Sequence, residues 1–419
     1  MTPQPPWLGE GLRHLWLPYA QMKTAPAPLP VRRVEGCRII LDDGRELIDG
    51  LASWWTACHG YRHPHIEQAV THQLALLPHV MFAGLVHEPA ARLSARLARL
   101  LPGDLDHVFF SESGSVAVEI ALKIAVQYWL NTGKERSRFL AFRDGYHGDT
   151  HWAMSVSDPE HGMHRALRRV LPRQIIADLP RDAASAAALE RILEREGSAL
   201  AAVIVEPLVQ GAGGMVFHDA ETLRKVAEAA KRHDLLLICD EIFTGFGRTG
   251  SLFACEQARI VPDIIMLSKA LTGGTLPLAA TVARRPVFEA FLSRDPDAAL
   301  MHGPTFMANP LACAAALASL DLFEREPRLA QVASIAEELS RALAPCGRLA
   351  GVKSVRVKGA IGVVELEGAV DRDALIRRFV AEGVWIRPFG NIVYVTPPLT
   401  IEPAELTRLT SAIVKVVSD

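Results

Sequence analysis

Short apolar runs, each followed by a polar or small residue, recur through the middle of the chain. The runs at 235–239 and Ile264–Leu267 contain no polar break, which is typical of strands buried on both faces of a parallel sheet. Helical spacing of apolar residues is found between such runs, for example at 116–130 and 220–233. Similar apolar runs occupy residues 107–110, 138–142 and 201–205. Strands that alternate with helices predict an α/β fold with a mostly parallel sheet and helices on both faces.

The pattern differs toward both ends of the chain. Proline and aromatic residues up to about residue 30 predict an irregular arm that packs over a site or across a subunit boundary. An Asp-Gly pair marks the turn of a predicted hairpin over 37–50. The stretch that leads to the strand at 201–205 is interpreted as a linker. Beyond about residue 315, a helical linker and short strands at 361–366 and 392–395 predict a small α+β domain.

The amino-acid composition argues against several classes of function. The 419 residues are 49% hydrophobic and carry a net charge of −2, so no nucleic-acid or anionic-membrane surface is expected. No apolar run reaches the length of a membrane span, and no signal peptide is expected at the N-terminus. The six cysteines are scattered, which favours reduced thiols and a cytoplasmic location.

Several histidines are candidate metal ligands by residue type. His59, His63 and His65 are poorly spaced for a metal, and Pro64 separates the last two. His147 lies four residues before His151, but no glutamate follows it and Gly148 weakens a helix there. We therefore expect no metal site.

Lys269 is the residue around which a function can be argued. It follows the strand Ile264–Leu267 and precedes a Gly-Gly pair, where the backbone can turn sharply. Asp240 ends the neighbouring predicted strand, and the carboxyl ends of such strands form the ligand crevice of open α/β folds. A lysine could merely extend to water at this position. An amine beside a carboxylate is, however, the pair that pyridoxal phosphate requires.

Two further segments bear on a cofactor. Gly114 and Ser115 stand between a predicted strand and a helix, where free N–H groups and hydroxyls can bind phosphate, although an ordinary serine N-cap is the alternative. Tyr146 follows the strand at 138–142 and can stack on a flat ring. The glycines at 211–214 do not fit a dinucleotide-binding loop, which disfavours a nicotinamide dehydrogenase.

Together these segments resemble the class III (ω-type) aminotransferases of fold type I, which depend on pyridoxal phosphate. The resemblance extends over nearly the whole chain. It rests on residues 53–55, 59–61, 114–119, 145–150, 210–215, 245–250, 269–274, 302–306 and 383–390.

The resemblance implies a role for each matching residue in cofactor binding. Lys269 is expected to form the Schiff base and to move the proton. Asp240 is expected to pair with the pyridine nitrogen. Tyr146 and Ile242 would flank the ring, and Gly114 with Ser115 would hold the phosphate.

Other matching residues are implied in substrate binding and assembly. Tyr19 is expected to act in catalysis and, with Trp54, Tyr146 and Gly303, to contact substrate. Arg387 would receive the carboxylate of the acceptor. Thr305 would reach the phosphate of the partner subunit, which implies a homodimer with shared sites.

Within the family, the segments are most similar to the biotin-pathway branch. That branch implies S-adenosylmethionine as amino donor and 8-amino-7-oxononanoate as acceptor, with lysine as donor left open. The alternatives are another ω-aminotransferase or a protein that binds the cofactor without turnover. The latter would be expected to lack the lysine, aspartate or arginine. The roles of Glu206 and Arg248 stay open. The family fold implies a large domain over 65–320 and a small domain from 1–64 with 321–419.

Overall fold

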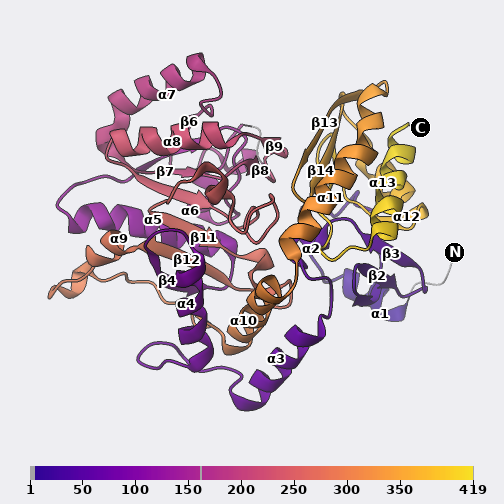
Figure 1. Cartoon of the computed structure of the whole chain (residues 1–419), viewed down its shortest axis with the longest axis horizontal. Helices are drawn as coiled ribbons and strands as arrows, with labels where there is room; N and C mark the ends of the chain where they lie inside the picture. Colours follow the sequence, from indigo (N-terminus) through magenta and orange to yellow (C-terminus); the bar gives the residue numbers. More distant parts are fainter. Residues whose placement is uncertain (1–4, 161–162, 419) are drawn as a thin grey trace.

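The computed structural model describes residues 5–160 and 163–418 and shows two lobes, each with its own β-sheet (Figure 1). The larger lobe is built on a seven-stranded sheet. In spatial order its strands are β4 (Leu105–Ser111), β12 (Ala279–Arg284), β11 (Ile264–Leu267), β10 (Leu236–Asp240), β7 (Leu200–Val205), β5 (Arg138–Phe142) and β6 (Ile175–Ala177). Strands β11 to β6 pair in parallel, whereas β12 is antiparallel to both of its neighbours. The expected mostly parallel sheet is confirmed.

Both faces of this sheet are buried, as the unbroken apolar runs predict. On β10, Leu237 and Cys239 belong to the same core cluster as helix α8 (Ala220–Arg232). Ile238, between them, packs instead with helix α5 (Gly114–Asn131). Successive side chains of a strand point to opposite faces, so two helix layers cover the sheet.

The smaller lobe is built from both ends of the chain (Figure 1). Strands β1 (Val31–Glu35), β2 (Arg38–Leu41) and β3 (Glu46–Asp49) are antiparallel, and β15 (Val384–Trp385) pairs with β3 in parallel. The hairpin around the Asp-Gly pair is thereby confirmed. Because β15 pairs with β3, we propose the division expected from the sequence, with 65–320 in one domain and 1–64 with 321–419 in the other.

The remaining elements complete the two lobes. The second sheet of the smaller lobe consists of β13 (Val352–Lys358), β14 (Ile361–Leu366) and β16 (Ile392–Val395). The larger helices are α3 (Pro64–Leu76), α4 (Glu88–Leu100), α10 (Pro310–Arg325), α11 (Arg328–Leu343), α12 (Arg372–Ala381) and α13 (Pro403–Ser418). The short elements are α2 (Ala52–Trp55), α9 (Arg285–Glu289), β8 (Val209–Gln210) and β9 (Val216–Phe217).

Two expectations from the sequence are wrong. The stretch interpreted as a linker contains α6 (His151–Ser155), strand β6 and helix α7 (Ala183–Glu196). Helix α7 begins at a capping box in which Asp182 and Ser185 satisfy each other's backbone N–H groups. The N-terminal arm is also not wholly irregular, because it includes helix α1 (Pro6–Leu12), whose proline stands at the favourable first position.

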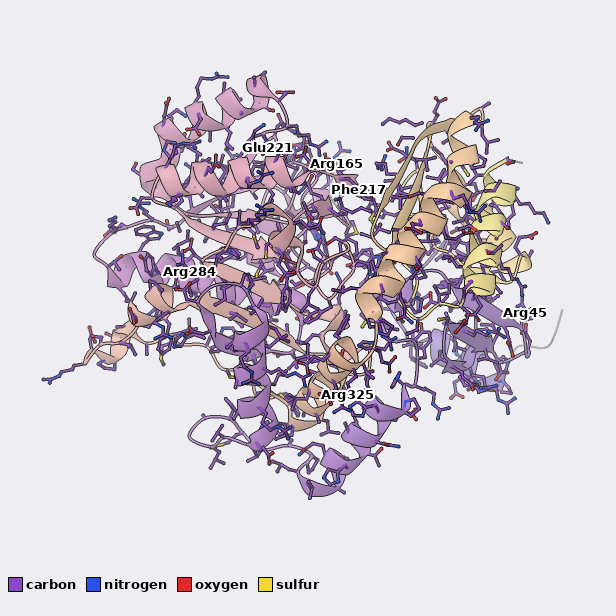
Figure 2. The ribbon with its side chains drawn as sticks, in the orientation of Figure 1. Arg45, Arg165, Phe217, Glu221, Arg284 and Arg325 are labelled. Carbon is purple, nitrogen blue, oxygen red and sulfur yellow. The ribbon has the colours of Figure 1, made fainter. Side chains whose placement is uncertain are left out.

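Charged side chains lie on the outside of both lobes, as Arg45, Glu221 and Arg325 illustrate (Figure 2). Within residues 5–160 and 163–418, no helix is both long and apolar enough to cross a bilayer.

Candidate active site

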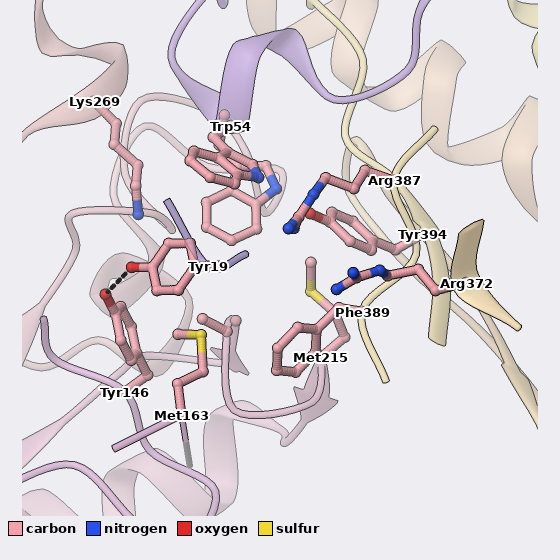
Figure 3. A pocket seen from close by; sticks show the side chains of 13 residues that line it. Tyr19, Trp54, Tyr146, Met163, Met215, Lys269, Arg372, Arg387, Phe389 and Tyr394 are labelled. Carbon is pink, nitrogen blue, oxygen red and sulfur yellow. Dashed lines mark hydrogen bonds between the residues drawn. The ribbon is translucent and has the colours of Figure 1, made fainter. Parts of the chain in front are cut away.

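Two connected cavities meet at Lys269, between the two lobes. The larger one, of about 380 Å³, is lined by residues of both lobes (Figure 3). The smaller one, of about 160 Å³, lies over the carboxyl ends of β10 and β11. Lys269, Trp55 and Tyr146 line both cavities, so the lysine amine can reach either space.

The backbone holds Lys269 in an unusual conformation directly after β11. Its φ is +44°, in the left-handed region that non-glycine residues seldom adopt. The amine lies 4.6 Å from the centre of the Trp55 ring. Burial lowers the pKa of Lys269 from 10.5 to about 8, although Asp240, Glu206 and Asp149 favour the protonated form. A lysine with a lowered pKa is a better nucleophile near neutral pH.

Asp240 and His147 form a buried pair at the bottom of the smaller cavity. Asp240 ends β10 and is 4% exposed, and its Oδ2 lies 2.7 Å from His147 Nδ1. Although burial opposes protonation of His147, the hydrogen bond to Asp240 raises its pKa. His147 Nε2 is buried without a hydrogen-bond partner. The pair therefore places a buried carboxylate, held by an imidazole, at the smaller cavity, where a polar ligand can meet the carboxylate.

The start of α5 forms the opposite wall of this cavity. Ser113 caps the helix by accepting a hydrogen bond from Val116 N, so the ordinary N-cap alternative holds for Ser113. Gly114 and Ser115, the next two residues, line the cavity. A Cβ on Gly114 would lie 3.0 Å from Ile242, so a larger residue would crowd this wall. Free N–H groups at a helix start are suited to an anion such as phosphate.

Glu206 fixes the backbone around Tyr146. Its two carboxylate oxygens accept hydrogen bonds from Tyr146 N at 3.0 Å and from Gly211 N at 2.9 Å. Burial raises the pKa of Glu206 to about 7. Glu206 lines the smaller cavity together with Tyr146, Asp240 and Ile242.

A left-handed turn brings two adjacent tryptophans into the site. Every residue of Ala52–Trp55 has a positive φ, from 46° to 71°. Asp49 stabilises this turn because its carboxylate accepts hydrogen bonds from Leu51 N and Ser53 N, both at 2.8 Å. As a result Trp54 lines the larger cavity, while Trp55 lines both and is only 8% exposed. Trp55 is therefore both a core residue and a wall of the two cavities.

Tyr19 and Tyr146 lie beside Lys269 (Figure 3), and both contact the carboxylate of Asp149. Tyr19 donates a hydrogen bond to Asp149 Oδ2 at 2.6 Å, and Tyr146 donates to Oδ1 at 2.8 Å. His164 and these hydroxyls lower the pKa of Asp149 to about 2. Tyr19 reaches the site from the N-terminal arm, so the expectation that the arm packs over a site is confirmed.

The far end of the larger cavity carries two arginines. Arg387 lies 5.5 Å from the centre of the Trp54 ring, and Arg372 extends from the start of α12 (Figure 3). Burial and the charge of Arg372 lower the pKa of Arg387. No described carboxylate forms an ion pair with Arg387, so a structural ion pair does not explain its position.

Gly303 and Thr305 do not line either cavity of their own chain. They lie in the segment before α10, where Thr305 is exposed. Arg248 is likewise outside the cavities: it is buried and donates hydrogen bonds to Ala360 O and Pro397 O. Arg248 thus joins the loop at 245–250 to the smaller lobe.

Sequence reasoning missed several residues of the site. Asp149, the acceptor of both tyrosine hydroxyls, carried no recognisable signal beyond its place in the segment at 145–150. The spacing of His147 and His151 raises only the question of a metal ligand, and the contact of His147 with Asp240 depends on the fold. The lining residues of the larger cavity that were not predicted include Met163, Met215, Arg372, Phe389 and Tyr394. Across the described ranges, no three His, Cys, Asp or Glu side chains are grouped as metal ligands would be.

Comparison with known proteins agrees with this geometry. The family model of class III aminotransferases matches residues 19–417. A curated relative from Mycobacterium leprae, adenosylmethionine-8-amino-7-oxononanoate aminotransferase, is 46% identical over 96% of this chain and 94% of its own. The enzyme of the same name from Corynebacterium glutamicum is 45% identical over 96% of both chains.

Solved structures show the same similarity in three dimensions. The adenosylmethionine-8-amino-7-oxononanoate aminotransferase of Methanocaldococcus jannaschii superposes with a TM-score of 0.93 at 31% identity, covering 98% of this chain and 97% of that one. An (S)-enantioselective omega-transaminase from Thermomicrobium roseum gives a TM-score of 0.90 at 31% identity, with the same coverage. The chain belongs to the class III aminotransferases, a family of pyridoxal-phosphate-dependent enzymes.

Proposed function

We propose that this protein transfers an amino group from S-adenosylmethionine to 8-amino-7-oxononanoate, with pyridoxal phosphate as cofactor. The observation that carries the proposal is the convergence of Lys269 and Asp240 at a cavity that continues to Arg387. The names of relatives that are up to 46% identical over nearly the whole chain support the choice of substrates.

The smaller cavity fits pyridoxal phosphate in its chemistry. Its walls offer a helix start with a glycine for the phosphate, a buried carboxylate for the ring nitrogen and a lysine for the aldehyde. The proposed cofactor-binding residues are Gly114, Ser115, Tyr146, Asp240, Ile242, Lys269 and, from the partner subunit, Thr305. When bound, the cofactor supplies an electron sink for the carbon that loses its proton.

The chain supplies the proton chemistry and the electrostatics. We assign the removal of the proton from the reacting carbon to Lys269 Nζ, because its pKa of about 8 lets it release and accept a proton near neutral pH. Asp240, held by His147, keeps a negative charge at the floor of the cavity. Tyr19 and Tyr146 hold a wall of the substrate space in place through Asp149.

The larger cavity has the features that the acceptor needs. The acceptor is an apolar chain with a ketone near one end and a carboxylate at the other. Trp54 and other apolar side chains form the walls, and Arg387 stands at the far end from Lys269 (Figure 3). An arginine can bind a carboxylate through two parallel hydrogen bonds, which would place the ketone at the amine.

We further propose a homodimer in which Gly303 and Thr305 complete the partner's site. The segments around residues 81–86 and 301–306 expose large apolar side chains that a second copy could cover. These are Met81 (60% exposed), Leu85 (50%), Val86 (71%), Met301 (81%) and Phe306 (57%). The composition and six buried free thiols support the proposed cytoplasmic location.

The proposal is tested by the absorbance of the bound cofactor. The purified enzyme with its cofactor is mixed in turn with S-adenosylmethionine, lysine, alanine and a diamine. We expect S-adenosylmethionine alone to convert the cofactor rapidly, and 8-amino-7-oxononanoate to reverse the change with formation of 7,8-diaminononanoate. Rapid conversion by lysine would assign the other donor, and conversion by alanine or a diamine alone would assign a different ω-aminotransferase.

A further inference from the structure

We infer that Arg372 is a second substrate-binding residue, which acts with Arg387 to hold a carboxylate at the far end of the larger cavity. The inference rests on the proposed function and deepens it. It assigns the recognition of the acceptor's carboxylate to a pair of arginines from two different elements.

Both guanidinium groups enter the same space. Arg387 follows strand β15, and Arg372 is the first residue of helix α12. Both line the larger cavity, and Figure 3 shows the two side chains extending into it from the same side, close to Tyr394 and Phe389. The two arginines are 15 residues apart in sequence and meet only because α12 folds back toward β15.

Arg372 and Arg387 repel each other across the cavity wall. A cation in the first turn of a helix also faces the positive end of the helix dipole, although Asp371 at the N-cap and Asp373 in the same turn offset this effect. Arg372 is also close enough to Arg387 to lower the pKa of that residue. Two like charges on the wall of one cavity repel each other, and a bound anion removes this repulsion.

The protein compensates these two charges only in part, because Asp373 is the acidic group whose charge acts on both Arg372 and Arg387. Arg372 Nε lies 3.5 Å from Asp373 Oδ1, but the Arg372 side chain is 42% exposed, so this pair is weak. In the described part of the chain, no carboxylate forms an ion pair with Arg387. The far end of the cavity therefore carries an excess of positive charge, to which an anionic ligand is complementary.

The surroundings identify the class of ligand. Phe389, Met215 and Trp54 line the path to the arginines, and they suit an aliphatic chain better than a sugar or a phosphate ester. The proposed phosphate site lies in the other cavity, at Gly114. The arginine pair is thus a site for the carboxylate of an aliphatic acid, and it disfavours a chain that ends in an ammonium group, such as a diamine.

Calorimetric titration of the cofactor-loaded enzyme with nonanoate and nonanamide tests the inference. The two probes share an aliphatic chain and differ in the charge of one end. Arg372→Gln should weaken nonanoate binding about fivefold or more and leave nonanamide unchanged, because a charge-assisted hydrogen bond is lost. The nonanoate affinity of Arg372→Lys should lie between that of the unaltered enzyme and that of Arg372→Gln. Lysine keeps the positive charge but lacks the planar guanidinium that can form two parallel hydrogen bonds. The control is Arg377→Gln, on the exposed face of the same helix.

The double variant Arg372→Gln/Arg387→Gln should bind the two probes equally. The inference is overturned if Arg372→Gln binds nonanoate within about a factor of two of the unaltered enzyme, or loses both probes to the same extent. Failure of the unaltered enzyme to prefer nonanoate over nonanamide would also overturn it. If the carboxylate preference depends on Arg372 while S-adenosylmethionine gives no turnover, the proposed function is wrong and this inference stands.

Discussion

At the scale of single residues, the site separates its charges. Lys269 and Asp240 lie at the ends of neighbouring strands, and Arg387 lies across the larger cavity in the other lobe. These three residues could be named from the sequence. Lys269 and Asp240 follow apolar runs, and Arg387 lies in a segment that resembles the family. Their partners were not, since the contact between His147 and Asp240 joins residues 93 positions apart.

The lowered pKa of Lys269 predicts how its amine reacts in the protein without cofactor. Only the neutral amine is acylated, so the rate of acetylation of Lys269 should rise with pH to a midpoint near 8 rather than 10.5. Asp240 favours the protonated amine, so Asp240→Asn should shift the midpoint to lower pH. Brief treatment with acetic anhydride, followed by mass spectrometry of the Lys269 peptide, measures both values. A midpoint near 10.5, or an upward shift in Asp240→Asn, would contradict the assignment.

Arg387 should affect only the half of the reaction that uses the acceptor. Loss of a charge-assisted contact costs about 1.5–3 kcal/mol, which corresponds to roughly one to two decades in kcat/KM for 8-amino-7-oxononanoate. Single-turnover measurements on Arg387→Gln should show this loss, whereas the step with S-adenosylmethionine should change far less. Arg377→Gln serves as the surface control. An equal loss in both half-reactions would favour a structural role instead.

At the scale of elements, the strands of the sheet were predictable and some connections were not. β11 is an unbroken apolar run and β10 is apolar up to Asp240 at its end, and burial on both faces explains that pattern. β12 was not predicted, because its alanines and threonine give little strand signal. The left-handed turn Ala52–Trp55 contains no glycine from which it could be predicted. It depends on hydrogen bonds that Asp49 accepts from the backbone of this segment in the folded chain.

Tyr61 is expected to stabilise this turn. Its hydroxyl donates a hydrogen bond of 2.6 Å to Asp49 Oδ2, and Asp49 is fully buried. Tyr61→Phe leaves this acceptor with one donor fewer, which should lower the free energy of unfolding by about 1–3 kcal/mol. Thermal and denaturant unfolding measure the change. Tyr128→Phe is the matched control, because the Tyr128 hydroxyl has no hydrogen bond to any residue that the structure describes. Equal effects of the two substitutions would refute the role of Tyr61.

At the scale of the whole molecule, the substrate space lies between two lobes, and one lobe is assembled from both ends of the chain. The pairing of β15 with β3 brings Arg387 into reach of the segment that carries Trp54. This arrangement could be expected from family resemblance but not from local patterns, because strand pairing over more than 300 residues leaves no local trace. The wrongly assigned linker shows the same limit, since β6 is only three residues long.

Mixed dimers test whether sites are shared between subunits. Lys269→Ala and Thr305→Ala chains are each expected to have little activity as homodimers. A heterodimer would carry one intact site and one site with both defects, so mixing under conditions of subunit exchange should restore activity. The recovered activity should scale with the fraction of heterodimer measured by native mass spectrometry. Mixtures no more active than the parents would show that each chain completes its own site.

The central claim, that Lys269 is the residue that bonds to the cofactor, has a direct chemical test. The enzyme with bound pyridoxal phosphate is reduced with borohydride, digested and analysed by mass spectrometry. The lowered pKa and the position of Lys269 between the two cavities predict a single pyridoxyl-modified peptide that contains Lys269. Modification of another lysine, with Lys269 left free, would contradict the account.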